Sequence, residues 1–66
     1  MDEQDNLALR KWLHDLNNRV GTILATAELM QMEQLPPKAS ERSRLIENKA
    51  LEVRDIIRNI QDRFMK

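Results

Sequence analysis

Gln34-Leu35-Pro36-Pro37 is the stretch of sequence that decides the fold of this 66-residue chain. Proline has no backbone N–H and clashes with the preceding helical turn, and it pushes the residue before it, here Leu35, out of helical geometry. The chain has no other proline and a single glycine, so one break divides it. We therefore predict a first helix over about residues 5–34, a turn over about 34–37 and a second helix over about 38–65.

Residues of known capping preference lie where these helices begin. Asp2 and Asp5 are both suitable N-caps for the first helix, because a short acidic side chain accepts hydrogen bonds from free backbone N–H groups. The second helix can begin with Pro37 in its first turn, or a few residues later with Ser40 as its cap.

Apolar residues on both sides of the turn recur at alternating steps of three and four. This spacing places them on one face of a helix and is typical of helices that pack lengthwise against each other. The two series are Leu9, Leu13, Leu16, Val20, Ile23, Ala27 and Met30, and then Ile46, Ala50, Val53, Ile57, Ile60 and Phe64. Two such helices joined by a short turn run antiparallel, so the sequence predicts an all-α, antiparallel two-helix hairpin.

The predicted apolar faces are wider than one partner helix can cover. Leu7, Trp12, Leu24 and Leu29 widen the first, and Leu45, Ile56 and Met65 widen the second. A chain of this size buries little apolar surface alone, and it has no cysteine and one histidine, so neither disulfides nor a metal cluster stabilise it. We therefore expect a homodimer in which two hairpins form a four-helix bundle; a longer coiled coil or a filament is the alternative.

Composition excludes several classes of function. Eleven basic and eleven acidic residues give a formal net charge of zero, which argues against nucleic-acid binding. No apolar run approaches the roughly 18 residues that a membrane span needs, and no signal peptide is visible, which favours a cytoplasmic protein with no membrane partner. The chain has no glycine-rich nucleotide loop, so it is not an autonomous ATP-dependent kinase.

The only candidate for chemistry is the segment around His14. This residue follows the seam residue Leu13, so its imidazole is expected at the border of the apolar face, pointing outward. Asp15 is its neighbour, and Asn18 lies one turn further along on the same face. An exposed imidazole is a nucleophile when its other nitrogen is fixed by a hydrogen-bond acceptor. Asp15 is the candidate for orienting or deprotonating the ring, and Asn18 is the candidate for holding a water or a phosphoryl oxygen beside it. A single histidine on a helix is otherwise an ordinary solvated residue.

His14-Asp15-Leu16-Asn17-Asn18-Arg19-Val20, continuing through Ile23 to Ala27-Glu28-Leu29-Met30, resembles the phosphoacceptor box of sensor histidine kinases. It is especially similar to the subgroup that reads H-D-[LF]-N-N-x-[LV]-x-x-I, followed by A-E-L-[LM]. In that family the box lies on the first helix of the dimerisation and histidine-phosphotransfer domain, a homodimeric four-helix bundle. The resemblance extends over nearly the whole chain, because residues 45–64 also fit the second helix of that domain.

The resemblance implies a role for each residue of the box. His14 corresponds to the phosphorylated residue, Asp15 to the acidic neighbour that assists transfer, and Asn18 to the position that orients a hydrolytic water. Arg19 stands where many members have a proline that bends the helix. The ATP-binding domain that follows the second helix in the family has no counterpart in this sequence.

Function in such a domain is phosphorelay, in which a phosphoryl group passes to or from an aspartate of a response-regulator receiver domain. The donor is either a kinase ATP-binding domain or a phosphorylated receiver. The chain itself needs no cofactor, because the Mg²⁺ of the reaction belongs to the receiver. With the turn near residues 36 and 37, His14 is level with residues 58 and 59, and the predicted receiver surface comprises Asn17, Gly21, Thr22, Arg54 and Arg58. The alternative is a non-catalytic module that binds a receiver, or only dimerises, without phosphotransfer.

Overall fold

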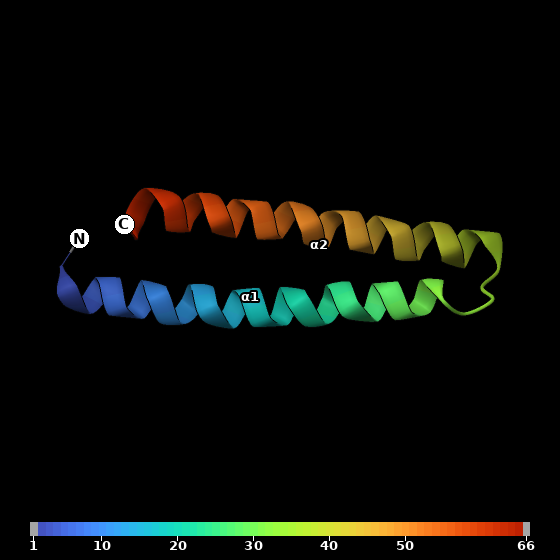
Figure 1. Ribbon diagram of the computed structural model, residues 1–66, viewed down its shortest axis with the longest axis horizontal. Coiled ribbons are helices and arrows are strands. Elements are labelled where there is room, and N and C mark those ends of the chain that lie inside the picture. Colours follow the sequence, from blue (N-terminus) through green and yellow to red (C-terminus); the bar gives the residue numbers. More distant parts are fainter. Residues whose placement is uncertain (1, 66) are drawn as a thin grey trace.

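The chain folds as two long antiparallel helices joined by a short turn (Figure 1). The computed structural model describes residues 2–65, with α1 at Glu3–Gln31 and α2 at Pro37–Phe64. The hairpin measures 50 × 16 × 13 Å, so it is a thin rod with a single layer of contacts between its helices. The predicted all-α antiparallel hairpin is confirmed.

Helix α1 begins at the first of its two candidate caps. The carboxylate of Asp2 accepts a hydrogen bond from the backbone N–H of Asp5 at 2.8 Å, which satisfies one of the free donors of the first turn. The helix ends at Gln31, earlier than the predicted end near residue 34. The N–H groups of Met32 and Glu33 turn back to carbonyls three residues earlier, so the chain has already tightened into a turn before it reaches the prolines.

Helix α2 begins with Pro37 at its first position, and Ser40 is not its cap. Pro36 precedes the helix in an extended conformation, and its carbonyl accepts the first intrahelical bond from the N–H of Ser40 at 2.9 Å. No side chain caps this helix. The fixed backbone angle of proline therefore replaces a side-chain cap at this end.

The contact between the helices is narrow. The residues buried in it are Leu13, Val20, Leu24, Ala27, Ser43, Ala50 and Ile57. Leu16 and Ile23, which the heptad spacing placed in the same seam, are each 48% exposed, and Leu24 is buried instead. The reason is that α1 carries two neighbouring apolar stripes and can turn only one of them toward α2.

Residue size changes along this contact. Ala27 and the fully buried Ser43 lie toward the turn, whereas Leu13 and Ile57 lie toward the open end. The Ser43 hydroxyl donates to the carbonyl of Ser40 at 2.8 Å, so this buried polar group is satisfied within its own helix. Small side chains let helix backbones approach closely, so the two helices can pack most tightly near the turn.

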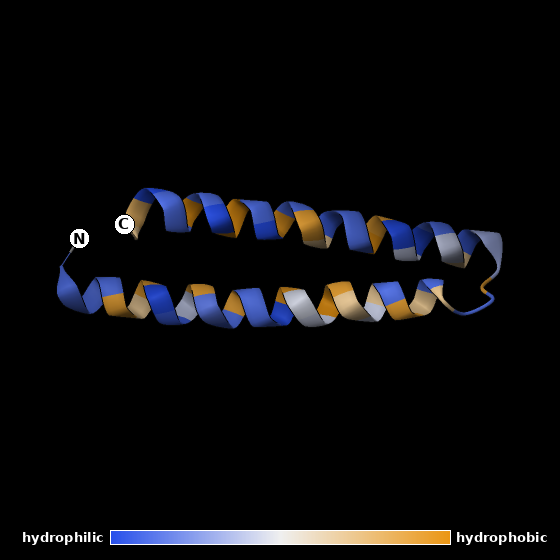
Figure 2. Ribbon diagram, viewed as in Figure 1, coloured by the Kyte–Doolittle hydropathy of each residue, from blue (hydrophilic) through white to orange (hydrophobic). Residues whose placement is uncertain are grey.

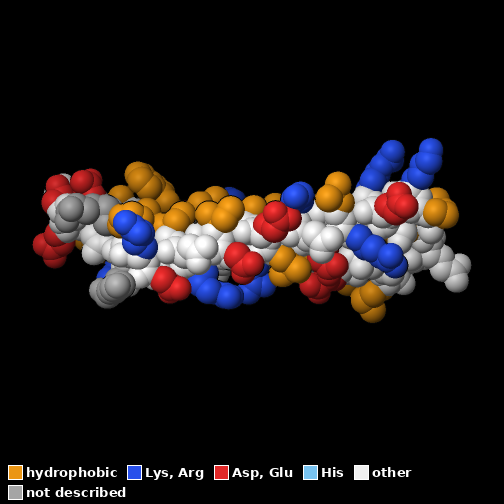
Figure 3. Space-filling model, turned by 90° about the horizontal axis from the view of Figure 1, so that it is seen from above, with side chains coloured by type: hydrophobic (Ala, Val, Ile, Leu, Met, Phe, Trp, Pro, Cys, Tyr) orange, Lys and Arg blue, Asp and Glu red, His pale blue; other side chains and the backbone are white. Residues whose placement is uncertain are grey.

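Many apolar residues of the hairpin remain uncovered. Among residues 2–65, twelve large hydrophobic side chains are at least 39% exposed, twice the number of hydrophobic residues in the core. Orange residues recur along both helices in Figure 2, and Figure 3 shows apolar side chains along one long edge of the molecule. An almost wholly apolar groove of about 380 Å³ between the two helices is lined by Val20, Ile23, Leu45, Ile46, Lys49, Ala50 and Val53. We name this groove, together with the exposed Leu16 that lies seven residues before Ile23 on the same side of α1, the apolar flank.

Neither helix, over residues 2–65, is long and apolar enough to cross a membrane.

Candidate functional site

His14 lies exposed on α1, one residue after the buried Leu13. Successive residues of an α-helix are rotated by about 100°, so burying Leu13 against α2 directs His14 away from the contact. The side-chain nitrogen Nδ2 of Asn18 lies 3.2 Å from Nε2 of His14. The i,i+4 spacing predicted from the sequence therefore brings these two side chains together.

This contact fits one neutral tautomer of His14. An amide nitrogen can only donate a hydrogen bond, so Nε2 of His14 is the acceptor and its lone pair is directed at Asn18. The neutral ring then has its proton on Nδ1. In this tautomer Nε2 carries the ring lone pair, and the Asn18 amide covers it.

Asp15 is half-buried on a different side of α1. Its backbone carbonyl accepts a hydrogen bond from Nη1 of Arg19 at 3.2 Å. Within residues 2–65, no hydrogen bond joins the Asp15 carboxylate to His14. The predicted role of Asp15 in assisting transfer stays a prediction, and Arg19 is directed toward the Asp15 side of α1.

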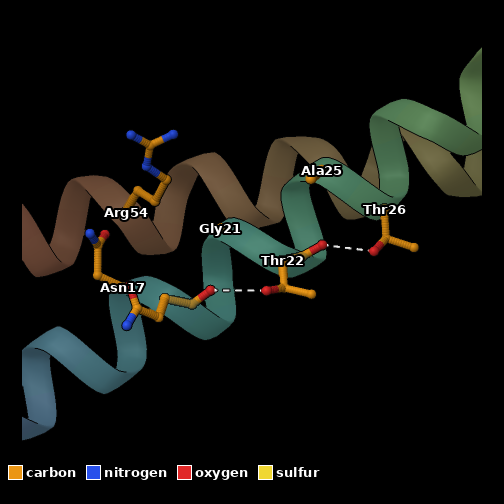
Figure 4. A pocket seen from close by; sticks show the side chains of 7 residues that line it. Asn17, Gly21, Thr22, Ala25, Thr26 and Arg54 are labelled. Carbon is orange, nitrogen blue, oxygen red and sulfur yellow. Dashed lines mark hydrogen bonds between the residues drawn. The ribbon is translucent and has the colours of Figure 1, made fainter.

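A polar groove of about 510 Å³ lies between the two helices (Figure 4), and Asn18, which contacts His14, is one of its lining residues. It is lined by Asn17, Asn18, Gly21, Thr22, Ala25 and Thr26 of α1 and by Arg54 of α2. Four of the five predicted partner-contact residues thus line one surface, and Asn18 connects it to His14. We name this surface the polar groove.

Two hydroxyls of the polar groove are already engaged with the α1 backbone. Thr22 Oγ1 donates to the carbonyl of Asn18 at 3.2 Å, and Thr26 Oγ1 donates to the carbonyl of Thr22 at 2.7 Å, as the dashed lines in Figure 4 show. Their hydrogens are therefore not available to a ligand. Gly21 leaves open space, because a Cβ built there meets no atom within 4 Å.

Arg58, the fifth predicted contact residue, does not line the polar groove. Its guanidinium lies 3.9 Å from the carboxylate of Asp55, in a solvent-exposed ion pair. Ala25 and Thr26 were not predicted, although their positions four and five residues after Gly21 place them one turn further along the same side of α1.

Residues 2–65 contain no group of three or more side chains that could hold a metal ion. The site therefore consists of one imidazole, the amide of Asn18 and the polar groove.

Comparisons of this chain with protein-family models, with curated proteins and with solved structures found no match.

Proposed function

We propose that this hairpin is a phosphorelay domain that accepts a phosphoryl group on His14 and passes it to or from an aspartate of a receiver domain. The observation that carries the proposal is the exposed imidazole of His14, whose Nε2 accepts a hydrogen bond from Asn18 beside the polar groove. The arrangement agrees with the resemblance of residues 14–30 to the phosphoacceptor box. We expect the domain to act in the cytoplasm.

The chemical step needs only the imidazole from this chain. Nε2 of His14 attacks the phosphorus of the donor, an N–P bond forms, and the P–O bond to ADP or to the donor's aspartyl carboxylate breaks. The ring becomes positively charged and loses its Nδ1 proton to solvent or to a nearby base, for which Asp15 is the candidate. In the return step a receiver carboxylate oxygen attacks the phosphorus and the N–P bond breaks. The receiver and its Mg²⁺ supply the charge stabilisation.

We propose further that two hairpins pair through the apolar flank to form a four-helix bundle. Leu16, Ile23, Ile46 and Val53 leave an apolar surface in water on this side, and soluble proteins rarely expose contiguous surfaces of that kind. A second copy offers a matching surface, since a two-fold dimer brings the same patch together from both chains.

Such a dimer leaves His14 accessible. Leu16 and His14 are two residues apart, so their side chains point about 200° away from each other around α1. Covering Leu16 with a second copy therefore does not cover the imidazole. The polar groove contains none of the exposed apolar residues of that flank, so pairing and receiver docking use different sides of the hairpin.

The test is phosphorylation by a sensor-kinase ATP-binding domain with radiolabelled ATP, or by a panel of phosphorylated receiver domains. The expected product carries one phosphate that is labile in acid and stable in base, and His14→Ala eliminates it while circular dichroism stays helical. Labelling that survives His14→Ala, or its absence with every donor, contradicts the proposal.

A second candidate is a module that binds a receiver without phosphotransfer. The observation that favours it is the occupied lone pair of Nε2, since Asn18 covers the nitrogen that must attack. Under this alternative His14→Ala weakens receiver binding only slightly, and no acid-labile phosphate forms on the chain. A chain that only dimerises binds no receiver at all.

A further inference from the structure

We propose that the polar groove holds the carboxylate of an acidic side chain from the protein that docks beside His14, with Arg54 as the residue that binds it. The identity of the docking protein rests on the proposed function above, whereas the affinity of the groove for a carboxylate does not.

The first argument is that Arg54 is a cation without an acidic partner. It is half-buried on α2 and makes no ion pair with any residue between positions 2 and 65. It is also the only charged residue among those that line the groove. A half-buried guanidinium has lost part of its hydration, so a complementary anion gains more there than at a fully exposed arginine.

The second argument is the supply of hydrogen-bond donors. The hydroxyls of Thr22 and Thr26 donate to backbone carbonyls, and the amide of Asn18 donates to His14. The side-chain donors left for a ligand are the five N–H groups of Arg54, the amide of Asn17 and the second N–H of Asn18. Figure 4 shows the Asn17 side chain extending from α1 toward α2, on the side where Arg54 leaves that helix. The groove therefore offers donors and one positive charge, which suits an anionic acceptor.

The third argument selects a carboxylate over a phosphate. A guanidinium binds a carboxylate through two parallel N–H···O bonds, and the two charges cancel. A phosphate dianion needs further cations, and the lining of the groove supplies only one. The open space at Gly21 leaves room for a side chain to approach Arg54 along the surface of α1.

The first experiment measures anion binding by NMR on the ¹⁵N-labelled chain, with sodium acetate as the probe and sodium chloride at equal ionic strength as the reference. The Nε–Hε signal of Arg54 and the side-chain amide of Asn17 are expected to shift several-fold more than the corresponding signals of exposed arginines. Arg54→Gln should remove the Asn17 shift. Arg44→Gln, a matched change at an exposed position of α2 outside the groove, should preserve it.

Equal shifts at all arginines, or an Asn17 shift that survives Arg54→Gln, overturn the carboxylate site. Inorganic phosphate that shifts Arg54 and Asn17 more than acetate does at equal ionic strength overturns the choice of ligand.

The second experiment uses any receiver that exchanges phosphate with His14. Arg54→Gln should raise the KM for that receiver about fivefold, the upper range for one partly exposed ion pair, with little change in kcat. Arg44→Gln should change neither constant. If no receiver exchanges phosphate, the proposed function fails. The acetate titration still decides whether the polar groove binds a carboxylate. A KM that does not respond to Arg54→Gln overturns the docking role.

Discussion

Nδ2 of Asn18 lies 3.2 Å from Nε2 of His14, one helical turn away on the same face of α1. In the tautomer with the proton on Nδ1, the amide donates to Nε2 and covers the nitrogen that would attack a phosphoryl donor in the proposed reaction. The same amide lines the polar groove, where it would meet a docked partner.

Asn18→Ala should separate phosphoryl acceptance from hydrolysis. Without the amide, Nε2 of His14 is uncovered, so we expect the rate of acceptance to be equal or higher. Hydrolysis of a phosphorylated receiver should slow by on the order of 100-fold, the usual effect of removing one positioned donor. Time courses with radiolabelled phosphate measure both rates. Asn17→Ala is the control. If Asn18→Ala accepts phosphate as slowly as His14→Ala does, the role given to the Asn18 amide is wrong.

Gly21→Ala should stabilise the hairpin and weaken docking. A Cβ at this position meets no atom within 4 Å, and alanine is favoured over glycine in a helix by about 1 kcal/mol. The midpoint of thermal or urea unfolding should therefore rise. If a partner approaches α1 closely at the polar groove, its affinity falls in the same variant. A stabilised variant with unchanged receiver affinity shows that the missing side chain has no role in docking.

Ile23→Glu should disrupt self-association. Ile23 is 48% exposed and lines the apolar flank, so a carboxylate there would be buried without a partner in the proposed bundle. Analytical ultracentrifugation should show a dimer for the natural chain and a monomer for the variant. Leu29→Glu is the matched control, since Leu29 is exposed but does not line that groove. A natural chain that sediments as a monomer contradicts the bundle.

Leu13→Ala should unfold most of the chain. Leu13 is 2% exposed, and deleting a buried leucine side chain destabilises a protein by about 2–5 kcal/mol, a large part of the stability of so small a domain. Leu7→Ala makes the same chemical change at a residue that is 61% exposed, and its unfolding midpoint should stay near that of the natural chain. Circular dichroism in urea measures both. Equal losses of stability in Leu13→Ala and Leu7→Ala would show that the contact between α1 and α2 does not stabilise the hairpin.

Most of the fold could be predicted because its signals are local. Pro36 and Pro37 break the helix by backbone chemistry alone, and the spacing of three and four identifies helices whatever packs against them. The end of α1 was placed too late, because the backbone tightens at Met32 and Glu33, where no side chain marks the change.

The choice of buried stripe could not be predicted from one chain. Helical spacing fits all four of the residues Leu16, Val20, Ile23 and Leu24. The spacing shows that each lies on an apolar side of α1, but it does not show which of them contacts α2. The burial of Ser43 does have a signal in the sequence, because Ser43, Ala50 and Ile57 are spaced by seven residues.

Part of the candidate site could be predicted from spacing. The contact of His14 with Asn18, and the position of Asn17 and Gly21 on one surface, follow from the pitch of a single helix. The ion pair of Arg58 with Asp55, and the turning of both threonine hydroxyls to the backbone, depend on rotamers that residue types do not specify.

The small residues Ala27 and Ser43 beside the turn make that end of the hairpin a natural pivot. The helices are joined covalently only there, so any splaying between them grows with distance from the turn and is larger at the half that carries His14. A force or ligand that changes the angle between α1 and α2 by a few degrees would therefore alter the spacing between Asn17 and Arg54 more than the spacing at Ser43. We therefore expect the width of the polar groove to respond to events elsewhere on the hairpin that change the angle between the helices.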